Sequence, residues 1–247
     1  SYALTSCSSS DDQISENLQN GSLTLKFDHI FNDSDLIFNS PYTTAAGEKV
    51  HIEQVKYIIS NIVLTKEDGT EFVLPKELSN FVITEVNGST SNITLANIPQ
   101  ANYTAVTFGL GIDESTYNQG GSNQGDFLAV AQNAAMLWSW SAGYKFFSME
   151  GYFFTQDVNT TQSFKIHTGK TGTAYNYSTI TLNFTDLAFV RTERTPQVHI
   201  MVDLSKVFEG AHTISLSDQA QIMGGDKVSQ VTANLKNMFK VHHLHNF

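Results

Sequence analysis

Short segments in which apolar and polar residues alternate recur along this chain, and they constrain its fold more than any other feature. In "SLTLKFDHI", the side chains of Leu23, Leu25 and Phe27 lie on one face of an extended strand. The stretch "VHIEQVKYIISNIVLTKEDGTEFVL" contains two apolar runs joined at residues 67–69, Glu-Asp-Gly. An Asp-Gly pair between two such runs predicts a β-hairpin.

The remaining segments support one large β domain. Further strand-like runs follow, separated by turns rich in Gly and Asn, and "DFLAVAQNAAM" is the only clear helical pattern. No internal repeat or linker divides residues 21–247, and a chain of 247 residues is long enough to bury a large core. We therefore predict an all-β fold. It would be a single antiparallel β-sandwich with a Greek-key or jelly-roll-like path and one or two short helices.

Charge and motif content exclude several classes of function. The 24 acidic residues outnumber the 14 Lys and Arg residues, which gives a net charge of −10. Such a chain repels phosphate backbones, so we expect no nucleic-acid partner. No apolar run approaches the roughly 20 residues that a membrane helix needs. The sequence also lacks the motifs of common nucleophile and metallopeptidase sites, so we expect a protein that is not an enzyme.

The N-terminal segment has the features of a lipid anchor. Cys7 is the only cysteine, and it follows "LTS" and precedes "SSSDDQ". Leu, two small residues and Cys resemble a bacterial lipobox, in which the cysteine is lipidated. Residues 1–20 would then be a signal-peptide remnant, the lipobox cysteine and a flexible tether. The anchor would hold the protein at the outer membrane, on its periplasmic or surface side, through the lipid alone. The alternative is a chance cysteine in a disordered N-terminus.

Histidines are the main candidates for metal ligands. In "FKVHHLHN" near the C-terminus, a regular strand would place Phe239, Val241, His243 and His245 on one face. Imidazoles at i and i+2 lie about 6–7 Å apart, which suits chelation of one ion. Imidazole binds copper, zinc and nickel well. His29 likewise lies at the end of an apolar strand face, the one formed by Leu23, Leu25 and Phe27, and is a further candidate. All of these histidines could instead be structural.

Both tryptophans of the chain fall in one stretch, "MLWSWSAGYKFFSMEGYF". In an extended segment Met136, Trp138 and Trp140 share a face. A thioether beside two indoles can form a soft, apolar environment for copper, or it can be a stripe of the core. In "FKIHTG", His167 points with Lys165 to the face opposite the apolar residues of its strand.

These segments together resemble the MbnP family. The tryptophan stretch resembles the family's Met-x-Trp-x-Trp-x-x-Gly-Tyr signature, and "VKYIISNIVL", "FKIHTG", "VDLSKVF" and "NMFKVHHLHN" resemble further family segments in order. The resemblance runs from about residue 22 to the C-terminus. It implies an extracytoplasmic β-sandwich that binds copper without turnover.

The resemblance also implies a ligand set. In characterised relatives, histidines and a tryptophan oxidised to kynurenine bind the copper, and a di-haem partner related to cytochrome peroxidases oxidises the tryptophan. Carried over, Trp138 or Trp140 would be the modified residue and His167 a ligand. Many relatives have His directly after the Met of the signature, where this chain has Leu137. Other histidines would then complete the set, and the candidates for that role are His29, His243 and His245.

A second function is compatible with the same sequence. β-Sandwich lipoproteins also serve as surface-exposed modules that bind carbohydrate or protein without a metal. Aromatic residues in loops can stack on sugars, and the candidates here are Tyr117, Tyr152, Tyr175 and Tyr177.

Overall fold

The computed structural model describes residues 19–85, 87, 90–155 and 158–247. The strands are β1 Gly21–Phe31, β2 Ser34–Asp35, β3 Pro41–Thr43, β4 Lys49–Lys66, β5 Glu71–Val73, β6 Phe81–Thr84, β7 Ser91–Ile98, β8 Ala101–Leu110, β9 Leu137–Ser139, β10 Gly143–Thr155, β11 Val158–Gly169, β12 Ser178–Val190, β13 Pro196–Asp203, β14 Gln221–Ile222 and β15 Phe239–Asn246. The helices are α1 Glu114–Tyr117, α2 Phe127–Asn133 and α3 Asp226–Leu235, with 3-10 turns η1 Lys76–Leu78, η2 Gly121–Asn123 and η3 Leu204–Val207.

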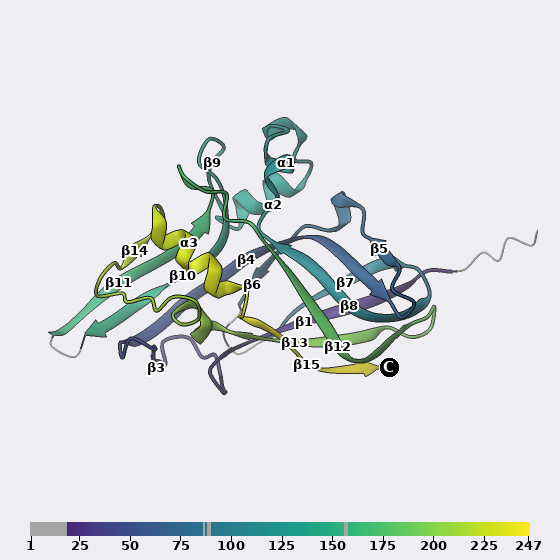
Figure 1. The fold of residues 1–247 in the computed structure, drawn as a ribbon, viewed down its shortest axis with the longest axis horizontal. Coiled ribbons are helices and arrows are strands. Elements are labelled where there is room, and N and C mark those ends of the chain that lie inside the picture. The colour runs from purple at the N-terminus through teal and green to yellow at the C-terminus, as the bar shows by residue number, and fades with distance from the viewer. Residues whose placement is uncertain (1–18, 86, 88–89, 156–157) are drawn as a thin grey trace, which may run out of the picture.

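Two β-sheets make up the body of the molecule (Figure 1). The smaller sheet has the order β15-β13-β1-β2, and β7 also pairs with β1. The larger sheet has the order β12-β8-β4-β10-β11-β14, and the short strands β3, β5, β6 and β9 pair along it. The predicted sandwich is thus confirmed.

The core lies between the two sheets. Phe27 on β1 packs edge-on against Tyr57 of β4 and Phe108 of β8, with ring centroids 6.2 and 6.5 Å apart. All three side chains are fully buried. Phe27 therefore joins the two layers, as the alternation in its segment predicted.

The pairing is mostly antiparallel, as predicted, with one long exception. β1 and β13 run parallel, with Thr24 opposite Gln197 and Ile30 opposite Asp203. On β13 the residues that face the core are fully buried, while His199 between them faces the other way. Parallel strands need a long connection, and here residues 32–195 separate the two. Local alternation carries no information on such a distant partner.

The C-terminal strand does not keep the regular alternation that we predicted. Against β13, His243 is opposite His199 whereas Val241 is opposite Ile200, so His242 is an extra, bulged residue. Phe239 and Val241 remain buried, but His243 and His245 come out on the opposite face of the sheet. The prediction that these four residues share a face was wrong because one bulge reverses the parity of a strand.

Three α-helices accompany the sheets. α2 lies within the predicted helical segment, and α1 lies in a loop that is rich in Gly, Asn and Gln. α3 was not predicted, and it packs against β11 through buried residues including Val228, Val231 and Leu235. Among the described residues, no helix is long and apolar enough to cross a membrane.

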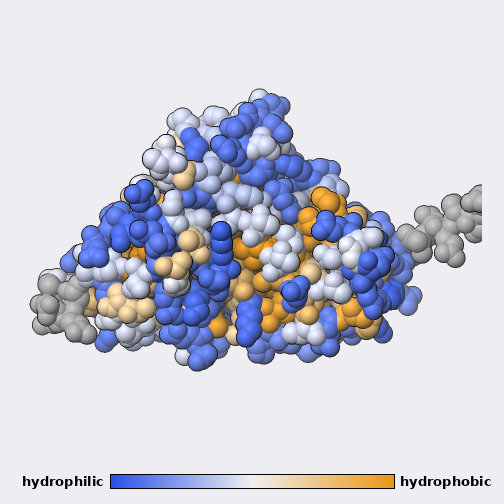
Figure 2. Space-filling view, viewed as in Figure 1, coloured by the Kyte–Doolittle hydropathy of each residue, from blue (hydrophilic) through white to orange (hydrophobic). Residues whose placement is uncertain are grey.

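The surface is mixed in polarity. Figure 2 shows polar residues over most of one face, with separate apolar patches in the middle and near β5. Val73 of β5 and Leu78 of η1 are 63% and 48% exposed. Apolar residues exposed in separate patches are normal for a globular protein, so we assign them no function.

Candidate functional site

Trp138 and His167 meet at one end of the larger sheet. The short strand β9 carries Trp138 and pairs with the start of β10, where Gly143 is opposite Ser139. β10 pairs in turn with β11, which carries His167 close to its end. The indole and the imidazole lie 6.2 Å apart between ring centroids. Two segments separated in the sequence, "MLWSW" and "FKIHTG", therefore form one site.

His167 is held by a carboxylate and has one free nitrogen. Its Nε2 lies 2.7 Å from Oε1 of Glu150 on β10. A carboxylate only accepts hydrogen bonds, so the neutral imidazole carries its proton on Nε2 and its lone pair on Nδ1. Nδ1 is buried and has no hydrogen-bond partner among the described residues. A buried lone pair without a partner is costly for a purely structural histidine.

The surroundings of His167 favour its neutral form. Burial lowers the pKa of His167, and the charges of Lys145 and Lys165 act in the same direction. Glu150 opposes this shift through its hydrogen bond and its charge, but burial is the larger effect. Metal ions bind the neutral imidazole, so burial favours the protonation state that His167 needs to act as a ligand.

Close packing explains why a glycine, Gly169, stands two residues after His167 in "FKIHTG". A Cβ atom at this position would lie 2.5 Å from the backbone oxygen of Tyr144 and 3.0 Å from the ring of Trp138. Because Gly169 has no side chain, the indole of Trp138 can pack against the end of β11. The motif therefore encodes the packing of Trp138 beside His167.

Trp140 occupies a different environment. It stacks on Tyr117 of α1 at 4.8 Å and meets Tyr144 edge-on at 6.2 Å. The hydroxyl of Tyr117 also donates a hydrogen bond to the backbone oxygen of Trp140. Of the two tryptophans, Trp138 is the one in contact with His167. Leu137, directly before Trp138, packs with a smaller apolar cluster and offers no donor atom.

His29 does not belong to this site. Its ring is buried between the sheets, where Nε2 lies 3.0 Å from the hydroxyl of Tyr57 and Nδ1 lies 2.5 Å from Oε2 of Glu85. Burial, and then the charge of Glu85, raise the pKa of Tyr57 well above its usual value, so the phenol stays protonated. Both imidazole nitrogens are engaged, which suits a structural role.

His243 and His245 lie on the other sheet, on strand β15. Their rings are 4.6 Å apart between centroids, and His243 also contacts His199 and His242. Figure 1 shows β9 and β15 at well-separated places in the fold. The four candidate histidines therefore fall into three separate environments. Sequence reasoning did not single out His199 and His242.

The other predicted residues are more dispersed. Cys7 lies outside the described residues. Tyr175 donates a hydrogen bond to the backbone oxygen of Ile112, and the hydroxyl of Tyr177 accepts one from the side-chain amide of Asn61. Tyr152 stacks on His51, 4.6 Å away. Tyr117, Tyr175 and Tyr177 pack around one small apolar cluster, with the rings of Tyr117 and Tyr175 6.1 Å apart between centroids, whereas Tyr152 lies elsewhere.

Beside Trp138, the surroundings of His167 are those of a histidine that binds a metal ion. Histidines that bind metals usually donate their second ring N–H to a carboxylate or a carbonyl oxygen. Glu150 supplies that partner, and Nδ1 of His167, which makes no hydrogen bond to the described part of the chain, is the candidate ligand atom. The indole of Trp138 is not a ligand in its unmodified form.

Comparisons with known proteins give one family and one fold. The family model MbnP matches residues 20–224. The solved structure of MbnP from Methylosinus trichosporium is similar, with a TM-score of 0.52 and 12% identity. The similarity covers 84% of this chain and 82% of that protein, and at this identity it concerns the fold alone. No curated protein matches the sequence.

Proposed function

The chain belongs to the MbnP family, and we propose from this that it is a non-catalytic copper-binding protein of the bacterial cell envelope. The observation that carries the proposal is the buried Nδ1 of His167, which has no hydrogen-bond partner among the described residues and belongs to a ring that lies beside Trp138. The Glu150 carboxylate holds the opposite nitrogen and so fixes the orientation of the ring.

In this proposal Trp138 is the second contributor to the site. Oxidation to kynurenine would break the C2–C3 bond of the indole, add oxygen from the oxidant used by the partner enzyme and release C2 as formate. The product has an aryl amine and a carbonyl, which are ligand atoms that indole lacks. A di-haem partner of the cytochrome-peroxidase type would carry out that oxidation. Trp138 is the better candidate than Trp140 because it contacts His167 and because Trp140 is stacked on Tyr117.

Anchoring completes the proposed function. A lipid on Cys7 would tether the domain to the outer membrane through the segment before Gly21, where β1 begins. The domain would then hold copper close to the membrane surface and would have no other contact with the bilayer. No catalytic step is part of this proposal.

Replacement of His167 tests the ligand assignment. We expect His167→Ala to weaken copper binding at this site at least about tenfold, since the loss of an outer-shell partner alone costs roughly 10–100-fold. Copper per chain after desalting and a competition titration measure the change. The exposed His212→Ala is the matched control and should bind like the parent. Equal affinity of His167→Ala and the parent would refute the assignment.

The position of the modified tryptophan can be read by peptide mass spectrometry of protein taken from its native envelope. We expect kynurenine at Trp138 and an intact indole at Trp140, because only Trp138 adjoins the proposed ligand. Protein made without the di-haem partner should keep both indoles. Kynurenine at Trp140 alone would contradict the proposal.

A further inference from the structure

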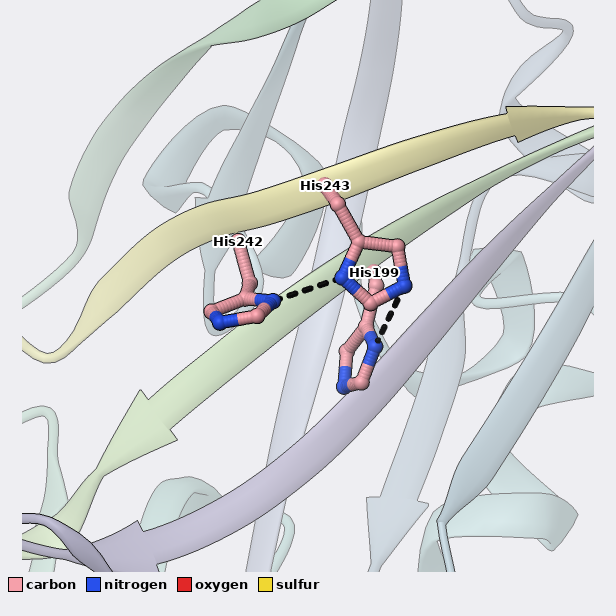
Figure 3. A group of neighbouring side chains, drawn as sticks. All are labelled: His199, His242 and His243. Carbon is pink, nitrogen blue, oxygen red and sulfur yellow. Dashed lines mark hydrogen bonds between the residues drawn. The ribbon is translucent and has the colours of Figure 1, made fainter.

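Three histidines meet on the outer face of the smaller sheet, away from the core. His199 comes from β13, and His242 and His243 come from β15, as Figure 3 shows. One ring nitrogen of each lies within 4.8 Å of the corresponding nitrogens of the other two. The neighbouring residues of β13, Val198 and Ile200, are fully buried on the opposite face. His242 is exposed, while His199 and His243 are partly buried, so the three rings do not fill a core position.

The bulge on β15 creates this arrangement. A regular strand would alternate His242 and His243 between the two faces. Because His242 is an extra residue in the ladder, His243 stays opposite His199 and both histidines of β15 remain on the outer side. Bulges often reorient side chains at functional sites. Here the bulge places the imidazole of His242 beside His199 and His243, which are opposite each other on the two strands.

A carboxylate fixes the orientation of the first ring. Nε2 of His199 lies 2.8 Å from Oδ2 of Asp28 on β1. Since the carboxylate accepts, Nε2 of His199 carries the proton, and Nδ1 of His199 accepts a hydrogen bond from Nε2 of His243, 3.2 Å away. A metal ion bound between these two nitrogens would take the place of the proton on Nε2 of His243. Asp28 thus stands behind His199 as outer carboxylates stand behind the histidines of metal sites.

The distances are close to those around a single ion. Metal–nitrogen bonds of about 2.0–2.1 Å place two ligand nitrogens roughly 3.3–3.4 Å apart in a tetrahedron. The separation of 3.2 Å between His199 and His243 already fits. His242 now contacts the other nitrogen of His243, with Nδ1 of His242 2.6 Å from Nδ1 of His243. One ligand nitrogen from each of the three residues nevertheless lies within 4.8 Å of the others, and His242 is exposed, so its ring can rotate toward an ion shared with His199 and Nε2 of His243.

Two charged residues of β1, Lys26 and Asp28, lie next to the cluster. Asp28 is the acidic group in contact with the cluster. Its negative charge offsets that of Lys26, which is opposite His199 on β1.

We propose that His199, His242 and His243 form a second metal site, distinct from His167, that binds a divalent transition metal with three imidazoles. Among the divalent ions that imidazole favours, Cu²⁺ binds most tightly by the Irving–Williams order, and Zn²⁺ binds less tightly. The three ligands leave a position open to solvent. The family match over residues 20–224 includes His199 but not His242 or His243.

Metal titrations of the full chain test the site, with Cu²⁺ and Zn²⁺ each used alone. We expect His199→Ala and His243→Ala each to abolish the binding of one ion per chain, or to lower its affinity by about 100-fold or more. Such a loss exceeds the roughly 10–100-fold effect of removing a residue that only hydrogen-bonds to a ligand. His242→Ala should weaken the same ion, and its exposed position leaves the fold unaffected. His212→Ala serves as the control. Circular dichroism confirms that each variant is folded.

Asp28 is a positioning residue in this account. We expect Asp28→Ala to weaken the ion about 10–100-fold, whereas Asp28→Asn should recover part of the loss because its amide oxygen can still accept from His199. The nitrogen couplings in the electron paramagnetic resonance spectrum of bound Cu²⁺ should stay those of three imidazoles in Asp28→Asn and fall to two in His242→Ala.

The two copper proposals can fail independently. If His199→Ala and His243→Ala bind Cu²⁺ and Zn²⁺ like the parent, the second site is refuted and the assignment of His167 is untouched. If only these variants lose metal and His167→Ala does not, the second site stands and the assignment of His167 is refuted. A parent chain that binds neither ion refutes the second site outright.

Discussion

The variant Glu85→Ala is expected to lower the free energy of unfolding by about 3 kcal/mol, the upper end of the cost of leaving a buried polar group without its partner. The Glu85 carboxylate lies 2.5 Å from Nδ1 of His29, and both side chains are at most 2% exposed. Without it, the polar edge of the His29 ring would stay in the core with the Tyr57 hydroxyl as its remaining partner. Water cannot replace the carboxylate at such depth without disturbing the packing between the sheets.

Urea denaturation measures this effect, with the exposed Glu193→Ala as control, for which we expect a change within about 0.5 kcal/mol. Tyr57→Phe should cost about 1–3 kcal/mol, because it removes one buried hydrogen bond of the same network. It should leave copper binding unchanged, since we assign His29 a structural role. A loss below about 1 kcal/mol in Glu85→Ala would contradict this account.

The second large effect is expected for Gly151→Ala, which should lower the free energy of unfolding by about 3 kcal/mol or more. A Cβ atom at residue 151 would lie 2.0 Å from the backbone oxygen of His51 on β4. Side-chain rotation cannot relieve a clash with backbone, so β10 and β4 must separate. The position follows Glu150 directly at an irregular step of the ladder. The same variant should therefore also weaken the hold of Glu150 on His167.

Gly172→Ala provides the matched control, because nothing lies within 4 Å of a Cβ atom at that position. Thermal unfolding of the two variants side by side gives the comparison. We expect the control to unfold at the temperature of the parent within a few degrees, and Gly151→Ala to unfold well below it or to be recovered in poor yield. Equal stability of both variants would show that the close approach of β10 and β4 is not a real constraint.

Much of the fold could be predicted from the sequence. Strict alternation placed Leu23, Leu25 and Phe27 on the buried face of β1, and Asp-Gly at residues 68–69 correctly marked the turn between β4 and β5. Both features are local, because side-chain parity and turn chemistry depend on a few neighbouring residues. The parallel pairing of β1 and β13 was missed because it joins segments that are far apart in the chain.

The candidate sites were predictable to different degrees. The tryptophan segment and "FKIHTG" could be assigned to one site through the family resemblance, and the structure places Trp138 and His167 in contact. The choice between Trp138 and Trp140 needed the position of Tyr117. The cluster at His199 was not predictable, because it depends on a single bulge and on the pairing of β13 with β15. One signal was present, since His199 occupies a polar position between two buried apolar residues.

Copper retained by the variant His199→Ala/His243→Ala, purified from its native envelope and desalted, tests the central claim most directly. This double variant lacks two histidines of the outer cluster, so its copper reports on the site at Trp138 and His167. We predict one copper ion per chain, and its loss when His167→Ala is added. Protein that carries no copper before that third substitution, or the same copper after it, would contradict the claim that this member of the MbnP family binds copper through His167.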